Sequence, residues 1–187
     1  MKPRRLCGFV AILVVAGCNQ PPQAAKGGPD PEPIQSSPTT PHDPNDYSGL
    51  RQFPLKNLLQ SSVTVNGEEI PVWVMDTEPK RAEGFMYLRS QDAPDGHGML
   101  FLLSTPEKRF KERGFWMRQC LMELDIAFMG PDKRVLNVAH GKVLDDTNLP
   151  AAGPYQYVLE LKAGEAAKFG VKPGTLIDFP SQLQGKP

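Results

Sequence analysis

The sequence predicts a mainly β or α+β fold: a compact, antiparallel, β-rich barrel-like domain of about seven strands and two short helices. Three observations lead to this prediction. Short runs of β-branched and aromatic residues recur between turn signals, glycine-containing turns join neighbouring runs into hairpins, and only two short stretches favour a helix. We expect one hydrophobic core, because roughly 125 globular residues can bury about two thirds of the surface of the unfolded chain.

The strands follow from local patterns. Asn66-Gly67 is a strong hairpin signal between the β-prone runs 62–65 and 70–75. A second hairpin is expected at the turn 130–133, because Leu124, Ile126 and Phe128 alternate with Asp125, Ala127 and Met129 before it. The remaining strands are expected at Gly98 to Leu103, Gly114 to Met117, Tyr155 to Leu161 and Thr175 to Phe179.

Two helices are predicted, both short. Thr77 is a candidate N-cap, and helix-forming residues continue to Tyr87. Gly84 is a weak point inside this stretch, since glycine costs about 1 kcal/mol relative to alanine in a helix. The second helix is expected over Ala163 to Phe169, ended by Gly170.

The N-terminus has the plan of an export signal. Basic residues precede the uncharged stretch 6–15, which is too short to span a bilayer, and small residues follow it. Val15-Ala16-Gly17-Cys18 resembles the lipobox of bacterial lipoproteins, which implies cleavage before a lipidated Cys18. The alternative is a soluble secreted protein that is cut nearby. Membrane attachment through the lipid on Cys18 is therefore expected, because the mature chain is mildly acidic and gains nothing from anionic headgroups.

Composition divides the rest of the chain. Residues 1–17 are the predicted signal peptide, and 18–54 are the lipidated N-terminus and a disordered, proline-rich stalk with eight prolines between Asn19 and Asp46. A globular domain is expected over 55–180, followed by a C-terminal tail, 181–187.

The 21 basic and 21 acidic residues of the chain balance, which argues against nucleic-acid binding. A monomer is expected.

Six motifs in the expected domain carry a resemblance to a known family. They are Arg81 to Met86, Gly98 to Phe101, Phe115 to Arg118, Leu124 to Phe128, Val158 to Leu161 and Gly170 to Gly174. Together they resemble the DUF192 (UPF0127) family, whose activity is undefined. The resemblance implies a β-rich barrel-like fold in an exported or lipid-anchored bacterial protein. Gln119-Cys120 and Glu123 depart from the usual pattern.

Side chains in these motifs define a candidate ligand-binding cleft. Asp125 points away from its neighbours Leu124 and Ile126, so an arginine is expected to pair with it if that side is not solvent. The candidate cleft residues are Arg81, Arg89, Trp116, Arg118 and Asp125. Glu160 on its own strand would likewise need a partner if its side of that strand is not solvent. Structural ion pairing and packing are the simpler interpretations of all these residues.

Cys120 is the weak candidate for catalysis. It would be the only free thiol of the mature chain, and a nucleophilic thiolate needs a base such as His97 or His140 nearby. The simpler interpretation is a small, semi-buried residue. We expect no metal and no cofactor, because no second histidine stands at a metal-site spacing and no phosphate-binding loop is present.

These observations favour a non-catalytic protein in the bacterial cell envelope that binds a small ligand or an envelope component. It would be lipid-anchored and face the periplasm or the exterior, with the outer membrane favoured in a diderm host. The alternatives are a hydrolase- or transferase-type enzyme that uses Cys120 or Asp125, and a purely structural interaction module. A closed pocket with convergent polar groups would favour the first hypothesis.

Overall fold

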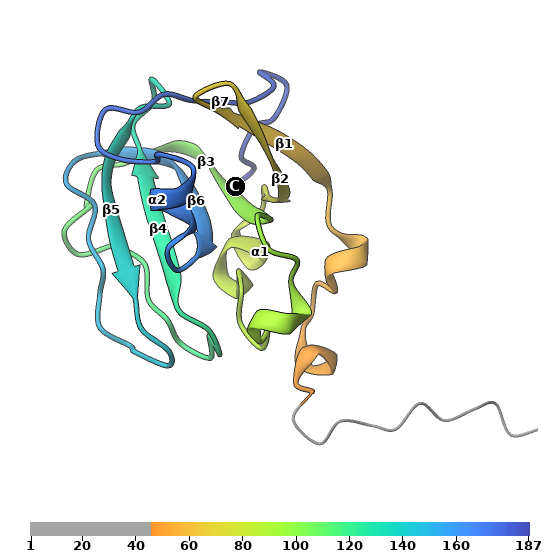
Figure 1. The fold of residues 1–187 in the computed structure, drawn as a ribbon. Coiled ribbons are helices and arrows are strands. Elements are labelled where there is room, and N and C mark those ends of the chain that lie inside the picture. Colours follow the sequence, from red (N-terminus) through yellow and green to blue (C-terminus); the bar gives the residue numbers. More distant parts are fainter. Residues whose placement is uncertain (1–45) are drawn as a thin grey trace, which may run out of the picture. The chain divides into compact units, whose positions relative to one another are not determined.

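The computed structural model describes residues 46–187 (Figure 1). Within this part of the chain there are seven strands, two short α-helices and three 3-10 helices. Their bounds are β1 Gln60–Val65, β2 Glu68–Met75, α1 Glu78–Glu83, β3 Gly98–Glu107, β4 Leu124–Met129, β5 Val135–Gly141, β6 Tyr155–Lys162, α2 Glu165–Lys168, β7 Ile177–Asp178, and η1 Ser48–Leu50, η2 Leu55–Asn57 and η3 Ser90–Asp92. Cys18 and the predicted signal peptide lie outside the described residues.

The strands form one mixed sheet in the order β5-β4-β6-β3-β2-β1-β7, which confirms the predicted mainly β, barrel-like fold. Every neighbouring pair is antiparallel except β2 and β3, which run parallel with Val72 opposite Gly98. A parallel pair requires a crossover connection. Residues 76–97 provide it and carry α1 and η3. The crossover was not predicted, and it builds one wall of the pocket described below.

The sheet is curled, so that its two ends lie close to each other. β7 pairs with β1, with Val65 opposite Ile177. Residues just before and within β7 also bond to the start of β5: the Val135 amide donates to the Thr175 carbonyl at 2.9 Å, and the Ile177 amide donates to the Lys133 carbonyl at 3.1 Å. These bonds bring the last strand between the first strand and β5, as in a half-barrel.

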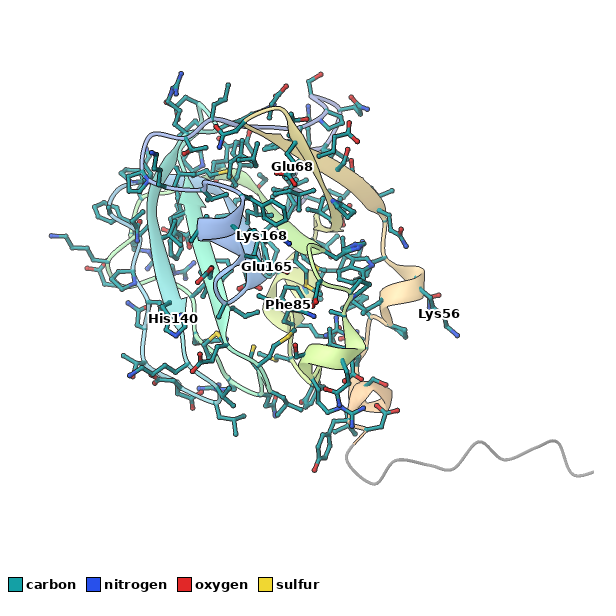
Figure 2. All side chains as sticks on the ribbon, viewed as in Figure 1. Lys56, Glu68, Phe85, His140, Glu165 and Lys168 are labelled. Atoms are coloured by element: carbon teal, nitrogen blue, oxygen red, sulfur yellow. The ribbon has the colours of Figure 1, made fainter. Side chains whose placement is uncertain are left out.

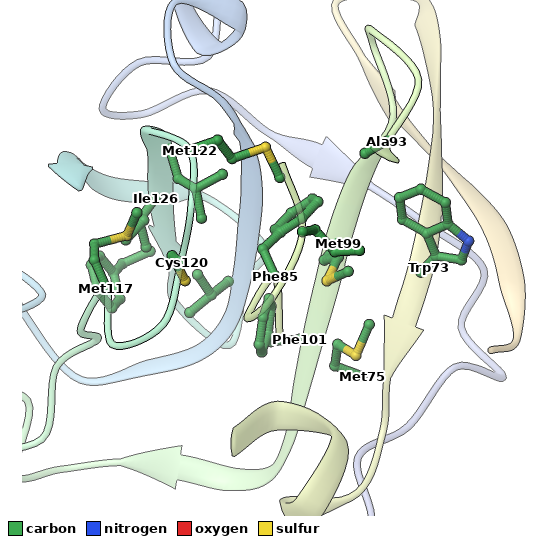
Figure 3. Close-up of a cluster of buried hydrophobic side chains, with 14 of the residues drawn as sticks. Trp73, Met75, Phe85, Ala93, Met99, Phe101, Met117, Cys120, Met122 and Ile126 are labelled. Atoms are coloured by element: carbon green, nitrogen blue, oxygen red, sulfur yellow. The ribbon is translucent and has the colours of Figure 1, made fainter. Parts of the chain in front are cut away.

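Both faces of the sheet are buried, so the domain has two apolar clusters. The inner cluster draws on every strand and on α2, and it includes Val72, Leu100, Leu159 and Ile177. The outer cluster lies on the other face of the central strands, under the connections, and it includes Trp73, Phe85, Met99, Phe101, Met117, Cys120 and Ile126 (Figure 3). Alternation along each strand sends successive residues to opposite clusters.

The hairpins confirm the turn signals. Asn66 and Gly67 have φ values of 52° and 86°, the left-handed geometry that a type I′ turn needs. Helix α1 stops at Glu83, earlier than Tyr87, because Gly84 takes a positive φ. The predicted strand at Gly114 to Met117 does not form: Phe115 makes only an isolated bridge to Leu149.

Packed structure begins before residue 55. The predicted stalk, 18–54, includes residues that pack in the structure: Arg51 is only 7% exposed, and η1 precedes it. The tail also packs, since the Lys186 amide donates to the Asp76 carbonyl at 2.6 Å. Both segments lack apolar runs, so composition alone did not reveal their contacts. No helix within residues 46–187 has the length and apolar character to cross a membrane.

Candidate functional site

Glu160 lies at the centre of the candidate site. Strand β6 runs between β3 and β4, so Glu160 is opposite Met99 on one side and Ile126 on the other. The residue is 4% exposed, and its carboxyl has no hydrogen bond or ion pair within the described part of the chain. Burial disfavours the charged form and raises the pKa of Glu160 to about 8. The carboxyl that faces the outer cluster is therefore largely protonated near pH 7.

The first wall of the site is α1 with the residues after it. Gly84, at φ 45°, lets the chain leave the helix directly over the sheet. A Cβ placed on Gly84 would come within 3.1 Å of Phe101 Cζ and 3.5 Å of Glu160 Oε2, so the backbone lies against both side chains. Phe85 then turns into the outer cluster, where its ring makes an edge contact with Trp73 at 6.4 Å between ring centres (Figure 3). Glycine is needed here for both its φ and its lack of a side chain.

A buried arginine holds this wall in place. Arg51 Nη1 donates to the carbonyls of Gly84 and Met86 at 2.8 and 2.6 Å, and its Nη2 lies 3.3 Å from Glu83 Oε2. The Glu83 carboxylate also accepts from the amides of Gln52 and Phe53. Arg51 and Glu83 thus bind the segment before η2 to the end of α1.

The second wall is the segment 113–120. Phe115 bridges to Leu149, with N···O distances of 2.9 and 2.8 Å, and its ring makes edge contacts with Phe101 and Phe128. Trp116 follows and is 48% exposed. The Tyr87 amide donates to the Gln119 carbonyl at 2.8 Å, which ties this wall to the first one.

The two walls and the sheet enclose a cavity of about 290 Å³. Its surroundings are mainly aromatic and apolar, with charged residues as well. The lining consists of Glu78, Arg81, Ala82, Glu83, Gly84, Phe85, Met86, Phe101, Leu103, Glu107, Arg113, Gly114, Phe115, Trp116, Cys120, Tyr155 and Glu160. A concave, largely apolar cavity with few polar groups is the usual form of a small-molecule site.

Of the predicted cleft residues, Arg81 and Trp116 line this pocket. Arg81 is largely engaged in structure: its Nη1 donates to the carbonyls of Asp76, Leu102 and Lys186 at 2.9–3.1 Å. Arg118 does not line the pocket, but its guanidinium stacks on Trp116 at 4.7 Å from the ring centre. Its Nε also lies 3.3 Å from Asp146.

Arg89 and Asp125 lie elsewhere. Arg89 forms a capping pair with Asp92 at the start of η3, with N···O distances of 2.9 and 3.0 Å. Asp125 Oδ2 accepts from the amides of Gly164 and Ala166 at 2.8 and 3.1 Å, at the start of α2. The expected arginine partner of Asp125 is not found within residues 46–187. Backbone amides and His140, whose Nδ1 lies 3.8 Å from Oδ1, surround it instead.

Cys120 lines the pocket but is a poor nucleophile. Burial raises the pKa of its thiol to about 12, with Glu160 adding to the effect and Arg51 opposing it. No histidine makes a hydrogen bond to this thiol within the described chain. His97 stacks on Trp73 with ring centres 3.7 Å apart, and His140 is an exposed residue of β5 (Figure 2).

Sequence reasoning missed most of the lining. For Glu160 the sequence raised only the same question as for Asp125, which is whether its side of the strand faces solvent or a partner. Arg51 and Glu83 gave no signal, because their contacts join segments about 30 residues apart in the chain. Within residues 46–187, no group of three or more His, Cys, Asp or Glu side chains is arranged to hold a metal ion.

Comparison with known proteins identifies the family. Residues 61–179 match DUF192, described as "Uncharacterized ACR", and the match covers more than half of the chain. The chain therefore belongs to the DUF192 family. No curated protein matches the chain.

Two solved structures have the same fold. A protein of unknown function from Novosphingobium aromaticivorans DSM 12444 is 35% identical, with a TM-score of 0.55; the match covers 65% of this chain and 84% of that one. A protein from Sinorhizobium meliloti 1021 is 24% identical, with a TM-score of 0.57; the match covers 65% of this chain and 95% of that one.

Proposed function

We propose that this domain is a non-catalytic module that binds a small organic molecule in the pocket between α1 and the segment 113–120. The observation that carries the proposal is the pocket itself. It is formed by two walls that are tied to each other and to the sheet, its surface is mainly aromatic and apolar, and one buried carboxyl faces it without a partner in the described chain. An apolar body and one polar group are the features that such a site recognises.

The candidate catalytic groups favour binding over thiol chemistry. A thiol with a pKa of about 12 is almost entirely protonated at neutral pH, and a thiolate is the reactive form. Asp125 is occupied by two backbone amides at α2. Within residues 46–187 the Cys120 thiol makes no hydrogen bond to a histidine, and Asp125 does not line the pocket.

Blocking the pocket tests this proposal. Ala82 is an exposed residue of α1 that lines the pocket, so Ala82→Trp is expected to fill its mouth. The probes are 2-phenylethylamine, 2-phenylethanol and phenylacetate, each added to the ¹⁵N-labelled domain and followed by amide chemical shifts. We expect at least one probe to shift amides of the lining, and Ala82→Trp to abolish the shifts.

The matched control places the same side chain elsewhere. Ala152 is exposed and does not line the pocket, so Ala152→Trp should leave probe binding unchanged. The proposal is overturned if none of the three probes shifts the lining at millimolar concentration, or if both tryptophan variants bind them equally.

We further propose that the mature protein is anchored in the bacterial envelope through a lipid on Cys18, as the lipobox-like sequence before it suggests. Replacing Cys18 with serine is then expected to leave uncleaved precursor and to abolish lipid-dependent membrane retention, since the sulfur is the attachment point. Cell fractionation and metabolic labelling with a fatty acid measure both effects. A Cys18→Ser protein that is still cleaved and membrane-bound would contradict the anchor.

A further inference from the structure

Each basic group around the pocket has an acidic neighbour, whereas one acidic group has no basic neighbour among the described residues. Glu107 Oε2 lies 3.5 Å from Arg113 Nη1, and Glu83 Oε2 lies 3.3 Å from Arg51 Nη2. Arg81 lies near Glu78 and Asp76: burial lowers its pKa, and the two acidic side chains oppose that shift. Each of these basic groups therefore has an acidic neighbour.

Glu160 is the exception among the described residues. The groups that approach it are apolar or neutral: Gly84 from the first wall, Phe101 from β3 and the Cys120 thiol from the second wall. Tyr155 lines the same pocket, but its hydroxyl donates to the Arg113 carbonyl at 2.7 Å. Burial raises the pKa of this tyrosine to about 12, so it adds no charge near neutrality. Arg51 is held by two carbonyls and by Glu83.

A buried carboxyl without a partner is unfavourable for the folded domain unless something binds to it. A bound cation would give ionised Glu160 the oppositely charged partner that it lacks within the described chain. An anion would meet the opposite situation, since the arginines of the lining already have acidic neighbours. The aromatic side chains Phe101, Phe115 and Trp116 also suit a cation, whose charge is attracted to aromatic faces.

We infer that the ligand of this pocket is an organic amine, bound as its ammonium ion, whose charged group pairs with Glu160 and whose apolar body lies among the aromatic side chains. This inference rests on the proposed function and adds the chemical class of the ligand. Binding is coupled to a proton. Glu160 is largely protonated in the free domain at pH 7, so pairing with the ammonium ion transfers the carboxyl proton to the buffer.

The same three probes distinguish this inference from the proposed function. Their phenyl bodies are nearly identical, and their polar groups are a cation, a neutral hydroxyl and an anion. We expect 2-phenylethylamine to bind about tenfold or more tightly than 2-phenylethanol, since charge-assisted hydrogen bonds are roughly twice as strong as neutral ones. Phenylacetate should bind most weakly.

Calorimetry in phosphate and in Tris counts the released protons, because these buffers differ in their heat of protonation. We expect release approaching one proton for each amine bound at pH 7, and none for the alcohol. Glu160→Gln should remove both the preference for the amine and the proton release. Glu112→Gln, at an exposed acid outside the pocket, should keep both.

Equal binding of amine and alcohol, or tighter binding of phenylacetate, overturns the amine inference and leaves the proposed function standing. Amine binding without proton release in the wild-type domain also overturns the inference, and this readout does not depend on whether any variant folds. Failure of all three probes overturns the inference and the proposed function together.

Discussion

Glu160→Gln is expected to remove a loss of stability that the wild-type domain suffers between about pH 4.5 and pH 8. In this range the unfolded chain has released the Glu160 proton while the folded domain still holds it, because burial raises the folded-state pKa from 4.5 to about 8. The unfolded state then binds fewer protons, so the free energy of unfolding falls as pH rises and levels off above about pH 8.

The size of the effect makes it measurable. A shift of this extent corresponds to a loss on the order of 3–5 kcal/mol across the range, and the glutamine variant should be the more stable protein at the alkaline end. Denaturant unfolding at several pH values measures it. Glu112→Gln is the control and should retain the wild-type dependence. A wild-type curve that parallels the glutamine curve throughout would show that Glu160 is charged and compensated when folded.

Other groups do not obscure this comparison. The carboxyls of Asp76, Asp92 and Asp178 have lowered pKa values, so the stability they contribute is present above the unfolded-state pKa and is lost only in acid. Burial lowers the pKa of His97, which makes stability rise with pH below its ordinary value of 6.5. Both contributions occur equally in wild type and Glu160→Gln, and the difference between the two proteins cancels them.

Arg51→Met is expected to destabilise the domain by about 3–5 kcal/mol, because it leaves Glu83 without its cation and frees two carbonyls. The side chains of Arg51 and Glu83 are 2% and 10% exposed, so little water can replace the lost contacts. Denaturant unfolding measures the loss. A double variant with Glu83→Gln should recover part of it, since that change removes the unpaired charge.

An exposed ion pair provides the matched control for Arg51. The side chains of Arg118 and Asp146 are 52% and 61% exposed at an N···O distance of 3.3 Å. Arg118→Gln should therefore cost less than about 1 kcal/mol. If Arg51→Met were as mild as this control, the segment before η2 would not be what holds the first wall.

Local signals in the sequence predicted the elements well. Asn66-Gly67 marked the first hairpin, because its turn needs backbone geometry that asparagine and glycine permit. Gly84 was expected only as a weak point in a helix that reaches Tyr87, but its positive φ ends α1 at Glu83. The prediction for Gly114 to Met117 was wrong: β-prone residues were present, but Phe115 finds a partner only in Leu149, far along the chain. The parallel pairing of β2 with β3 is also non-local, and no short pattern encodes it.

The site was also predictable only in part, because many of its contacts join residues that lie far apart in the chain. Trp116 and Arg81 lie in motifs that reach the pocket. Arg89 instead pairs with Asp92, three residues along the chain, and Asp125 accepts hydrogen bonds from two backbone amides. Asp125 shows how alternation can mislead. It does point away from the outer cluster, but the groups that meet it are the amides at the start of α2, which a strand pattern does not predict.

The closure of the sheet by β7 also constrains how the chain can fold. Val65 pairs with Ile177, so one of the earliest strands in the chain needs one of the last residues as its neighbour. Contacts between residues this far apart close large loops and slow the search for the native state. During synthesis the inner cluster stays incomplete until β7 is available, and the nascent chain must keep that apolar surface from aggregating in the meantime.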